Sequence, residues 1–390
     1  MDFPKKKIDT YQLSPSSLTP RSYFPMKASS STERILNEVQ QMKKLQRSDP
    51  LVSKNQNSLK YLKLAPIQPF NDSQEISSQI NSKSRRNYKL QGIHPINITK
   101  NCVSRCAYIS QKGSENKIPH DNNQDSILFQ TKLNSQAYQF LFGVFDGHGS
   151  YGHLVSNFIK KTINLSIPRC LPEAQENDMI NFLCQSIDQA INDLNTSNID
   201  INISGSTLCL IMISGPQIVC ASIGDSRCII GKFIETWDYE ILSIEHKPTV
   251  YDEVQRIEQA GGLVSVAPNI RNKTQGMLRV WSDDSDIPGL AMTRSIGDKL
   301  MKNIGVIDKC DITKHKITNE DKFAILATDG VWDVLSNEDA VRIVAKYWKE
   351  GKSELACKGL ADAATKKWEE CGVRVDDISL VVVFLHAKDY

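Results

Sequence analysis

The feature that most constrains this fold is a succession of short apolar runs that begins near residue 100. Runs of β-like composition occupy residues 138–145, 206–214, 217–223, 228–233, 239–244, 323–327 and 378–385. A Gly-Pro pair separates the second run from the third and indicates a hairpin. Helical periodicity appears over residues 152–165, 177–194, 250–260, 337–349 and 353–368. Strands grouped with hairpins, and helices grouped in pairs, favour an α+β fold over a doubly wound parallel sheet.

The distribution of charge divides the chain into an arm and a body. Residues 1–90 hold 16 Lys and Arg against 7 Asp and Glu, a net +9, and the remainder holds 31 against 38, a net −7. The arm is rich in Ser and Pro, so we expect most of it to be disordered. A capping-box pattern precedes Ile35, Val39 and Met42, and predicts a short helix near residues 33–47 that forms on binding an unidentified partner. Residues 91–390 are expected to form one compact domain.

Composition excludes several classes of protein. No apolar run approaches the roughly 20 residues that cross a bilayer, so we expect no membrane span. The ten cysteines are scattered and provide no zinc-site spacing, which is typical of reduced thiols in a cytoplasmic or nuclear protein. The basic arm lacks interleaved aromatic residues and a compact basic patch, so nucleic-acid binding is not expected. We expect the chain to be a monomer.

Acidic residues stand where several expected strands begin or end. They are Asp125, Asp146, Asp225, Asp329 and the pair Asp376-Asp377. A single Asp-Gly pair is more typical of a turn. Two such pairs behind apolar strands, with a third acidic site before another strand, favour a site for Mg²⁺ or Mn²⁺ over one for zinc. His148 lies between two glycines beside Asp146, where it is expected to titrate near neutral pH.

Residues 145–149, Phe-Asp-Gly-His-Gly, resemble the signature of the metal-dependent type 2C protein serine/threonine phosphatases. Further blocks follow in that family's order at residues 205–207, 224–227, 246–248, 260–262, 288–298, 328–332 and 376–379. The resemblance implies two antiparallel β-sheets packed as a sandwich with helices on both outer faces, which agrees with the α+β pattern. It also implies that residues 91–390 are a phosphatase catalytic domain acting on phosphorylated proteins.

The resemblance further implies a site for two Mg²⁺ or Mn²⁺ ions and a weaker third. The implied metal ligands are Asp125, Asp146, the backbone carbonyl of Gly147, Asp225, Asp329 and Asp376. Asp146 would bridge the two principal ions, and Asp225 stands at the position associated with the third. His148 matches the general acid of the family. Lys112 matches, in a subgroup of the family, an arginine position that binds the substrate phosphate.

Two departures from the family pattern concern the implied site. Gln124 stands where many members have glutamate, which removes one charge from the metal site. Lys112 replaces an arginine, so a point charge replaces a two-pronged contact with phosphate.

The implied reaction is hydrolysis of phosphoserine and phosphothreonine monoesters by in-line attack of a hydroxide that bridges the two ions. His148 would donate a proton to the leaving oxygen. The alternative function is a catalytically weak or dead member of the same fold that serves as a binding or scaffold module. A hydrolase of small phosphates would use the same site. Retention of Asp146, Asp329 and Asp376 favours an enzyme, because a scaffold has no use for carboxylates that repel one another.

Overall fold

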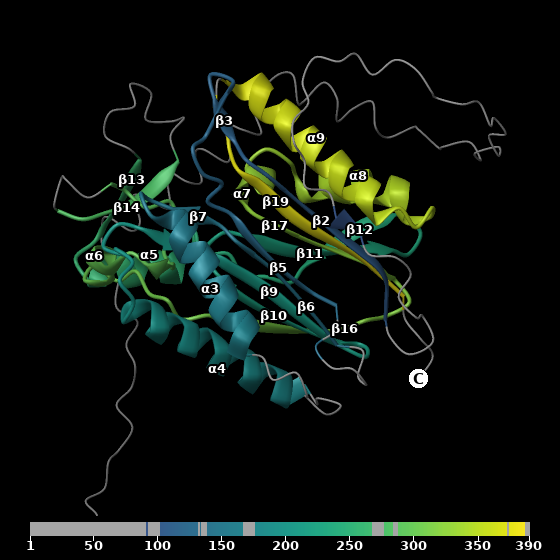
Figure 1. Cartoon of the computed structure of the whole chain (residues 1–390), viewed down its shortest axis with the longest axis horizontal. Helices are drawn as coiled ribbons and strands as arrows, with labels where there is room; N and C mark the ends of the chain where they lie inside the picture. The colour runs from purple at the N-terminus through teal and green to yellow at the C-terminus, as the bar shows by residue number, and fades with distance from the viewer. Residues whose placement is uncertain are drawn as a thin grey trace, which may run out of the picture.

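The computed structural model of the chain describes residues 91–92, 102–131, 133, 139–166, 176–266, 277–283, 288–372 and 374–386. The expected arm, residues 1–90, and its helix near residues 33–47 lie outside these residues, and both stay predictions. The described elements form four layers, with helices on the outside and two sheets between them (Figure 1). Among the described helices, none is long and apolar enough to cross a membrane.

The larger sheet has six strands in the order β1-β2-β19-β17-β11-β12, and all of its pairings are antiparallel. Its strands are β1 Gln91–Gly92, β2 Val103–Gln111, β11 Arg227–Phe233, β12 Trp237–Ile241, β17 Asp321–Ala327 and β19 Ile378–Leu385. Every residue of β19 is buried. Because this central strand is covered on both faces, its sequence is an unbroken apolar run rather than an alternating one.

The second sheet has five strands in the order β16-β10-β9-β6-β5, also antiparallel. Its strands are β5 Ser126–Gln130, β6 Gln139–Phe145, β9 Leu208–Ser214, β10 Gln217–Ile223 and β16 Asp311–Lys316. Phe140, Phe142 and Val144 of β6 pack between the two sheets. The alternate residues Leu141 and Phe145 pack under the outer helices. This period of two allows one strand to contribute to two cores.

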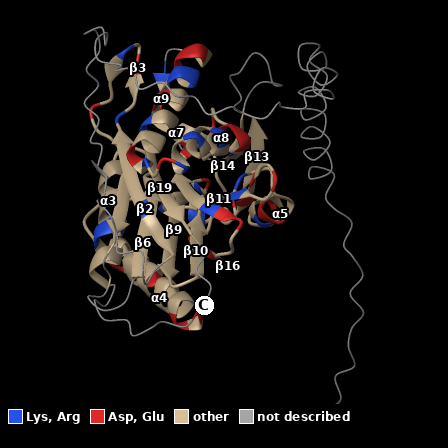
Figure 2. Ribbon diagram, turned by 90° about the vertical axis from the view of Figure 1, so that its right-hand side faces the viewer, with Lys and Arg blue, Asp and Glu red and all other residues tan. Residues whose placement is uncertain are grey.

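Two pairs of helices cover the outer faces of the sandwich. Helices α3 (Gly152–Ser166) and α4 (Glu176–Asn195) lie on the five-stranded sheet, and α8 (Asn337–Trp348) and α9 (Ser353–Cys371) lie on the six-stranded sheet (Figure 1). The central strands β6, β9, β10 and β19 contain no Lys, Arg, Asp or Glu, whereas many charged residues lie in the helices and loops (Figure 2). The α+β sandwich with helices on both outer faces is therefore confirmed.

Strands β2 and β16 of the sandwich were not among the predicted runs. In β2, Ser104 and Arg105 interrupt the apolar residues, so no run stands out. Strand β16 lies at the edge of its sheet and pairs only with β10, and none of its residues is fully buried. Its polar composition therefore carries no apolar signal. Its place in the sheet comes from backbone pairing with β10.

Short elements connect the layers at one end of the sandwich. A three-stranded sheet joins β7 (Gly147–His148), β8 (Gly205–Ser206) and β15 (Ile296–Gly297), and another joins β3 (Ser114–Glu115), β4 (Ile118–Pro119) and β18 (Arg374–Val375). The short helix α7 (Asp329–Trp332) follows β17. These elements lie where the strands of both sheets end (Figure 1).

A smaller unit, here called the flap, comprises the described residues between 251 and 302. It contains α5 (Tyr251–Gln259), the strand pair β13 (Leu263–Val266) and β14 (Leu278–Trp281), and α6 (Lys299–Lys302). Val254, Ile257 and Val280 belong to its own small apolar cluster. The flap lies at the same end of the sandwich as β7 and α7 (Figure 1).

Glu253 anchors the first helix of the flap. Its buried carboxylate accepts hydrogen bonds from Arg256 at 2.7 and 2.8 Å, from Thr293 Oγ1 at 2.6 Å and from Arg294 at 2.8 Å. Burial alone would raise the pKa of this carboxyl, but the bonds from Arg256 and Arg294 outweigh burial and lower the pKa to about 2. The ionised carboxylate therefore joins α5 to the chain that precedes β15.

We predict that Glu253→Gln lowers the free energy of unfolding by about 2–3 kcal/mol at neutral pH. Because the folded pKa lies below the unfolded value of about 4.3, the stabilisation by the carboxylate is complete above that value. It is lost as the pH falls towards 2. Urea unfolding should therefore show a large difference between wild type and variant at pH 6 and roughly half of that difference at pH 3. An equal difference at both values would contradict this account, and Glu235→Gln on an exposed turn is the control.

Candidate functional site

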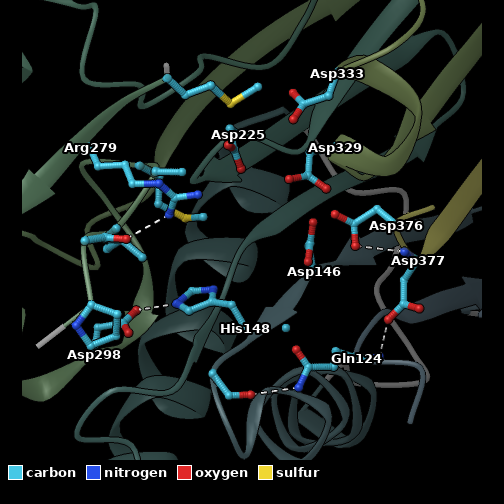
Figure 3. A pocket seen from close by; sticks show the side chains of 18 of the residues that line it. Gln124, Asp146, His148, Asp225, Arg279, Asp298, Asp329, Asp333, Asp376 and Asp377 are labelled. Carbon is cyan, nitrogen blue, oxygen red and sulfur yellow. Dashed lines mark hydrogen bonds and ion pairs between the residues drawn. The ribbon is translucent and has the colours of Figure 1, made fainter. Parts of the chain in front are cut away.

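The strand ends of both sheets meet the flap at a pocket of about 970 Å³ (Figure 3). Six of the eight residues predicted for the site line it: Asp146, Gly147, His148, Asp225, Asp329 and Asp376. Of the other two, Asp125 is buried beside this group and Lys112 lies outside the lining. The predicted clustering of acidic residues at strand ends thus occurs in the structure.

Asp146 and Gly147 are positioned by the end of β6, whose seven residues are all buried. The backbone then turns directly into β7. A side chain at position 147 would place its Cβ 2.3 Å from the carbonyl oxygen of Gly152 and 2.6 Å from that of Gln124. Only glycine fits so close an approach of backbone to backbone, and it leaves the Gly147 peptide at the wall of the pocket.

Three of the carboxyl groups lie near one another, and each is at least partly buried. The pKa of Asp146 is raised well above its usual value by burial and then by the charge of Asp125. Burial and the charge of Asp146 raise the pKa of Asp329 in the same way. Burial, with the charges of Asp377 and Asp329, raises the pKa of Asp125. These groups repel one another when ionised, so ionisation requires a compensating positive charge.

Asp225 and Asp376 complete the acidic wall. Burial raises the pKa of Asp225 to about 6, although the ammonium group of Lys247 acts in the opposite direction. Asp376 is more exposed, and its carboxylate lies 3.3 Å from the guanidinium group of Arg374. Asp377, next in sequence, accepts backbone hydrogen bonds from Gly113 at 2.6 Å and Gln124 at 2.7 Å. It therefore braces the loop that carries Asp125.

The chemistry of these donors fits divalent cations that prefer oxygen. Asp125 Oδ1 and Asp225 Oδ1 are buried and have no hydrogen-bond partner among the described residues. Buried carboxylate oxygens without partners are costly unless a cation or a proton compensates them. As the described side chains stand, no three of His, Cys, Asp or Glu converge closely enough to hold one ion. The fit therefore rests on the oxygen donors, their burial and their mutual repulsion.

Gln124, which stands where many family members have glutamate, lines the pocket. Its Nε2 donates a hydrogen bond of 2.7 Å to the carbonyl oxygen of Gly149. The amide nitrogen is thus occupied by the backbone (Figure 3). The amide oxygen remains as a neutral donor for a cation or for water.

His148 sits at the flap side of the pocket on β7. Its Nε2 lies 2.7 Å from Asp298 Oδ2. Burial opposes protonation of the ring, but the charge and hydrogen bond of Asp298 outweigh it, so the pKa of His148 is raised. The ring is therefore placed to carry and release a proton in the pocket.

Among the described residues, three Lys and Arg side chains line the pocket, and Lys112 is not one of them. Lys247 lies 3.6 Å from Asp333, and Arg374 pairs with Asp376. Arg279 of β14 donates a hydrogen bond of 2.8 Å to the carbonyl oxygen of Gly289. Among the described residues it makes no ion pair with a carboxylate, so its charge is directed to the pocket (Figure 3). Lys112 is exposed, and its Nζ lies 3.4 Å from the carbonyl oxygen of Asp121.

The sequence analysis assigned no role to several residues of the site. They are His120, Lys247, Arg279, Asp298, Asp333 and Arg374. Lys247 lies in the family-like block 246–248, and Asp298 lies in the family-like block 288–298. Asp333 is one helical turn beyond Asp329. The sequence around each of these residues therefore gave some indication of a site. Arg279 had none, because an arginine in a short amphipathic strand is typical of an exposed surface.

Comparisons with known proteins identify relatives of this chain. A family model described as protein phosphatase 2C matches residues 109–370. Probable protein phosphatase 2C 72 of Arabidopsis thaliana is 35% identical over 284 residues, which cover 68% of this chain and 82% of the plant protein. Probable protein phosphatase 2C 48 of Oryza sativa subsp. japonica is 31% identical over 297 residues, which cover 68% of this chain and 80% of the rice protein.

Solved structures show the same fold at lower identity. The serine-threonine phosphatase 2C from Toxoplasma gondii has a TM-score of 0.63 and 20% identity, and the match covers 76% of this chain and 99% of that one. A sex determining protein from C. elegans has a TM-score of 0.55 and 22% identity, covering 74% of this chain and 66% of that one. At these identities the likeness concerns the arrangement of sheets and helices.

We predict that Asp146→Asn does not destabilise the metal-free chain and stabilises it by about 1 kcal/mol, or roughly 2–4 °C in melting temperature. The reason is that one of the repelling buried charges is removed. Thermal unfolding in excess chelator measures the effect, and Asp238→Asn on an exposed strand is the matched control. A loss of several degrees for Asp146→Asn alone would show that the carboxylates are not in net repulsion.

Proposed function

Because the chain belongs to the protein phosphatase 2C family, we propose that its acidic pocket hydrolyses phosphoserine and phosphothreonine monoesters in proteins. The observation that carries this proposal is the meeting of His148 with buried, partly unpartnered carboxylates in one pocket. Neither His148 alone nor the carboxylates alone would indicate this reaction. Together they supply a proton donor and a place for positive charge beside the same substrate.

The ligands proposed for two Mg²⁺ or Mn²⁺ ions and a weaker third are Asp125, Asp146, the Gly147 carbonyl, Asp225, Asp329 and Asp376. Such ions lower the pKa of water to give a nucleophile near neutral pH, and they screen the charge of the phosphoryl oxygens. The carboxylates of this chain select oxygen-preferring cations and hold them at a fixed end of the sandwich. Gln124 contributes a neutral oxygen in the same wall.

The substrate phosphate needs a basic residue of the pocket as its partner. Lys247 is already paired with Asp333, and Arg374 is already paired with Asp376. Arg279 has no such partner in the described part of the chain, and a guanidinium group can contact two phosphate oxygens at once. We therefore assign Arg279 to the substrate phosphate, while Lys112 remains the assignment predicted from the sequence.

His148 provides the proton that the leaving oxygen needs. An alkoxide from serine or threonine is strongly basic, so breaking the P–O bond without protonation is slow. A positioned acid contributes about 10²- to 10⁴-fold in such reactions. Asp298 stabilises the protonated ring that gives up this proton.

We predict that the purified full-length chain releases phosphate from a phosphoserine peptide only in the presence of Mn²⁺ or Mg²⁺. Exhaustive chelation should remove nearly all turnover, and added Mn²⁺ should restore it. Phosphate release is measured directly, with Asp146→Asn as the inactive control. No turnover with either ion would favour the binding or scaffold module, and full turnover after chelation would exclude the metal assignment.

We predict that Arg279→Ala raises the KM for a phosphoserine peptide by about 10- to 100-fold, because a hydrogen-bonded charge pair with phosphate is lost. Arg279→Lys should recover part of the loss. Lys112→Ala should change KM much less, because the Lys112 side chain is exposed outside the lining. Steady-state kinetics at saturating Mn²⁺ provide the comparison. A larger effect for Lys112→Ala than for Arg279→Ala would favour the assignment predicted from the sequence.

A further inference from the structure

Asp298 is a buried carboxylate whose role the family comparison leaves open. It lies between β15 and α6 and is only 2% exposed. Its Oδ2 accepts two short hydrogen bonds, one of 2.7 Å involving His148 Nε2 and one of 2.6 Å from Ser295 Oγ. Figure 3 shows the contact between His148 and Asp298. Through Ser295, the same oxygen also connects the histidine on β7 to the segment that precedes β15.

The backbone around the contact between Asp298 and His148 has an unusual conformation and leaves room for both side chains. Asp298 has φ 49° and ψ 51°, the left-handed conformation that residues other than glycine rarely adopt. Gly205 of β8 pairs with His148 on one side and with Gly297 on the other. A Cβ at Gly205 would lie 2.2 Å from Asp298 Oδ2 and 2.7 Å from His148 Nε2. The side chains of Asp298 and His148 thus pack directly against the backbone of Gly205, where no side chain would fit. An unfavourable conformation kept beside a site is a recurrent mark of function.

The contact distinguishes the two nitrogens of the ring. Nε2 is occupied by Asp298, whereas Nδ1 is buried and has no hydrogen-bond partner within the described residues. A carboxylate can only accept, so its partner nitrogen must carry the hydrogen in both charge states of the ring. In the neutral ring Nδ1 then has the free lone pair, and in the charged ring Nδ1 holds the proton that can leave.

We propose that Asp298, supported by Ser295, is a positioning residue that fixes the orientation and the hydrogen placement of the His148 ring, which leaves Nδ1 as the nitrogen that carries the transferable proton. This inference rests on the proposed function for the identity of the leaving group. In the step, a water oxygen forms the new bond to phosphorus, and the P–O bond to serine or threonine breaks with its electron pair on the leaving oxygen. The Nδ1 proton moves to that oxygen, and the ring becomes neutral with its Nε2 hydrogen still bonded to Asp298.

The kinetic test compares two leaving groups. Asp298→Asn should lower kcat for a phosphoserine peptide by about 10²-fold, because the ring loses its fixed orientation and hydrogen placement. It should lower kcat for p-nitrophenyl phosphate by no more than a few-fold, because nitrophenolate leaves without a proton. Adding Asp298→Asn to His148→Gln should cause little further loss, since both changes remove the same function.

A second histidine–aspartate pair in the chain provides the matched control. His246 is buried, and its Nε2 lies 3.0 Å from Asp311 Oδ2, but neither residue lines the pocket. Asp311→Asn should therefore affect the two substrates equally. An equal loss on both substrates for Asp298→Asn, or no loss, would overturn the proposal, because Asp298 would then act on stability or on phosphate binding.

A spectroscopic measurement separates this inference from the proposed function. Nitrogen-15 NMR of the metal-free wild-type chain, with the His148 signal assigned by its loss in His148→Gln, should show the hydrogen of the neutral ring on Nε2. A hydrogen on Nδ1 in the neutral ring would overturn the proposal whether or not the chain is an active phosphatase. Absence of turnover with an Nε2 hydrogen present would instead count against the proposed function alone.

Discussion

The structure depends on holding several partly buried carboxyl groups near one another, where water screens their charges poorly. Asp125, Asp146 and Asp329 all have raised pKa values because each is buried and each lies near another acid. Isolated side chains would avoid such an arrangement. The sandwich imposes it, because strands buried on both faces leave their end residues no freedom to move apart.

This constraint explains why the rest of the site surrounds the acidic wall. Asp377 braces the loop before Asp125 through two backbone hydrogen bonds, and Gly147 lets β6 turn tightly beside Gln124. The flap closes the other side with Arg279 and Asp298. One wall therefore carries the carboxyl groups, and the opposite wall carries the guanidinium group of Arg279 and the Asp298 carboxylate that contacts His148.

The sequence predicted the parts of this architecture that leave an uninterrupted apolar signal. Strands β6, β17 and β19 are buried on both faces, so their runs and the acids at their ends stand out in the sequence. Strand β2 is interrupted by polar residues and β16 is an edge strand, so neither produces such a run. The same relation between burial and sequence pattern holds for the residues of the site. Residues that adjoin a buried strand, such as Asp146, could be predicted. Arg279 reaches the pocket from a short strand of the flap, and only the tertiary structure shows this.

The central claim is that the carboxylate wall binds divalent cations, and Mn²⁺ binding measured by electron paramagnetic resonance tests it most directly. Free Mn²⁺ gives a strong six-line signal that weakens when the ion is bound. Titrating the full-length chain should remove this signal in a saturable way, and Asp146→Asn should restore most of it. A signal as strong with the wild-type chain as in buffer alone would contradict the account.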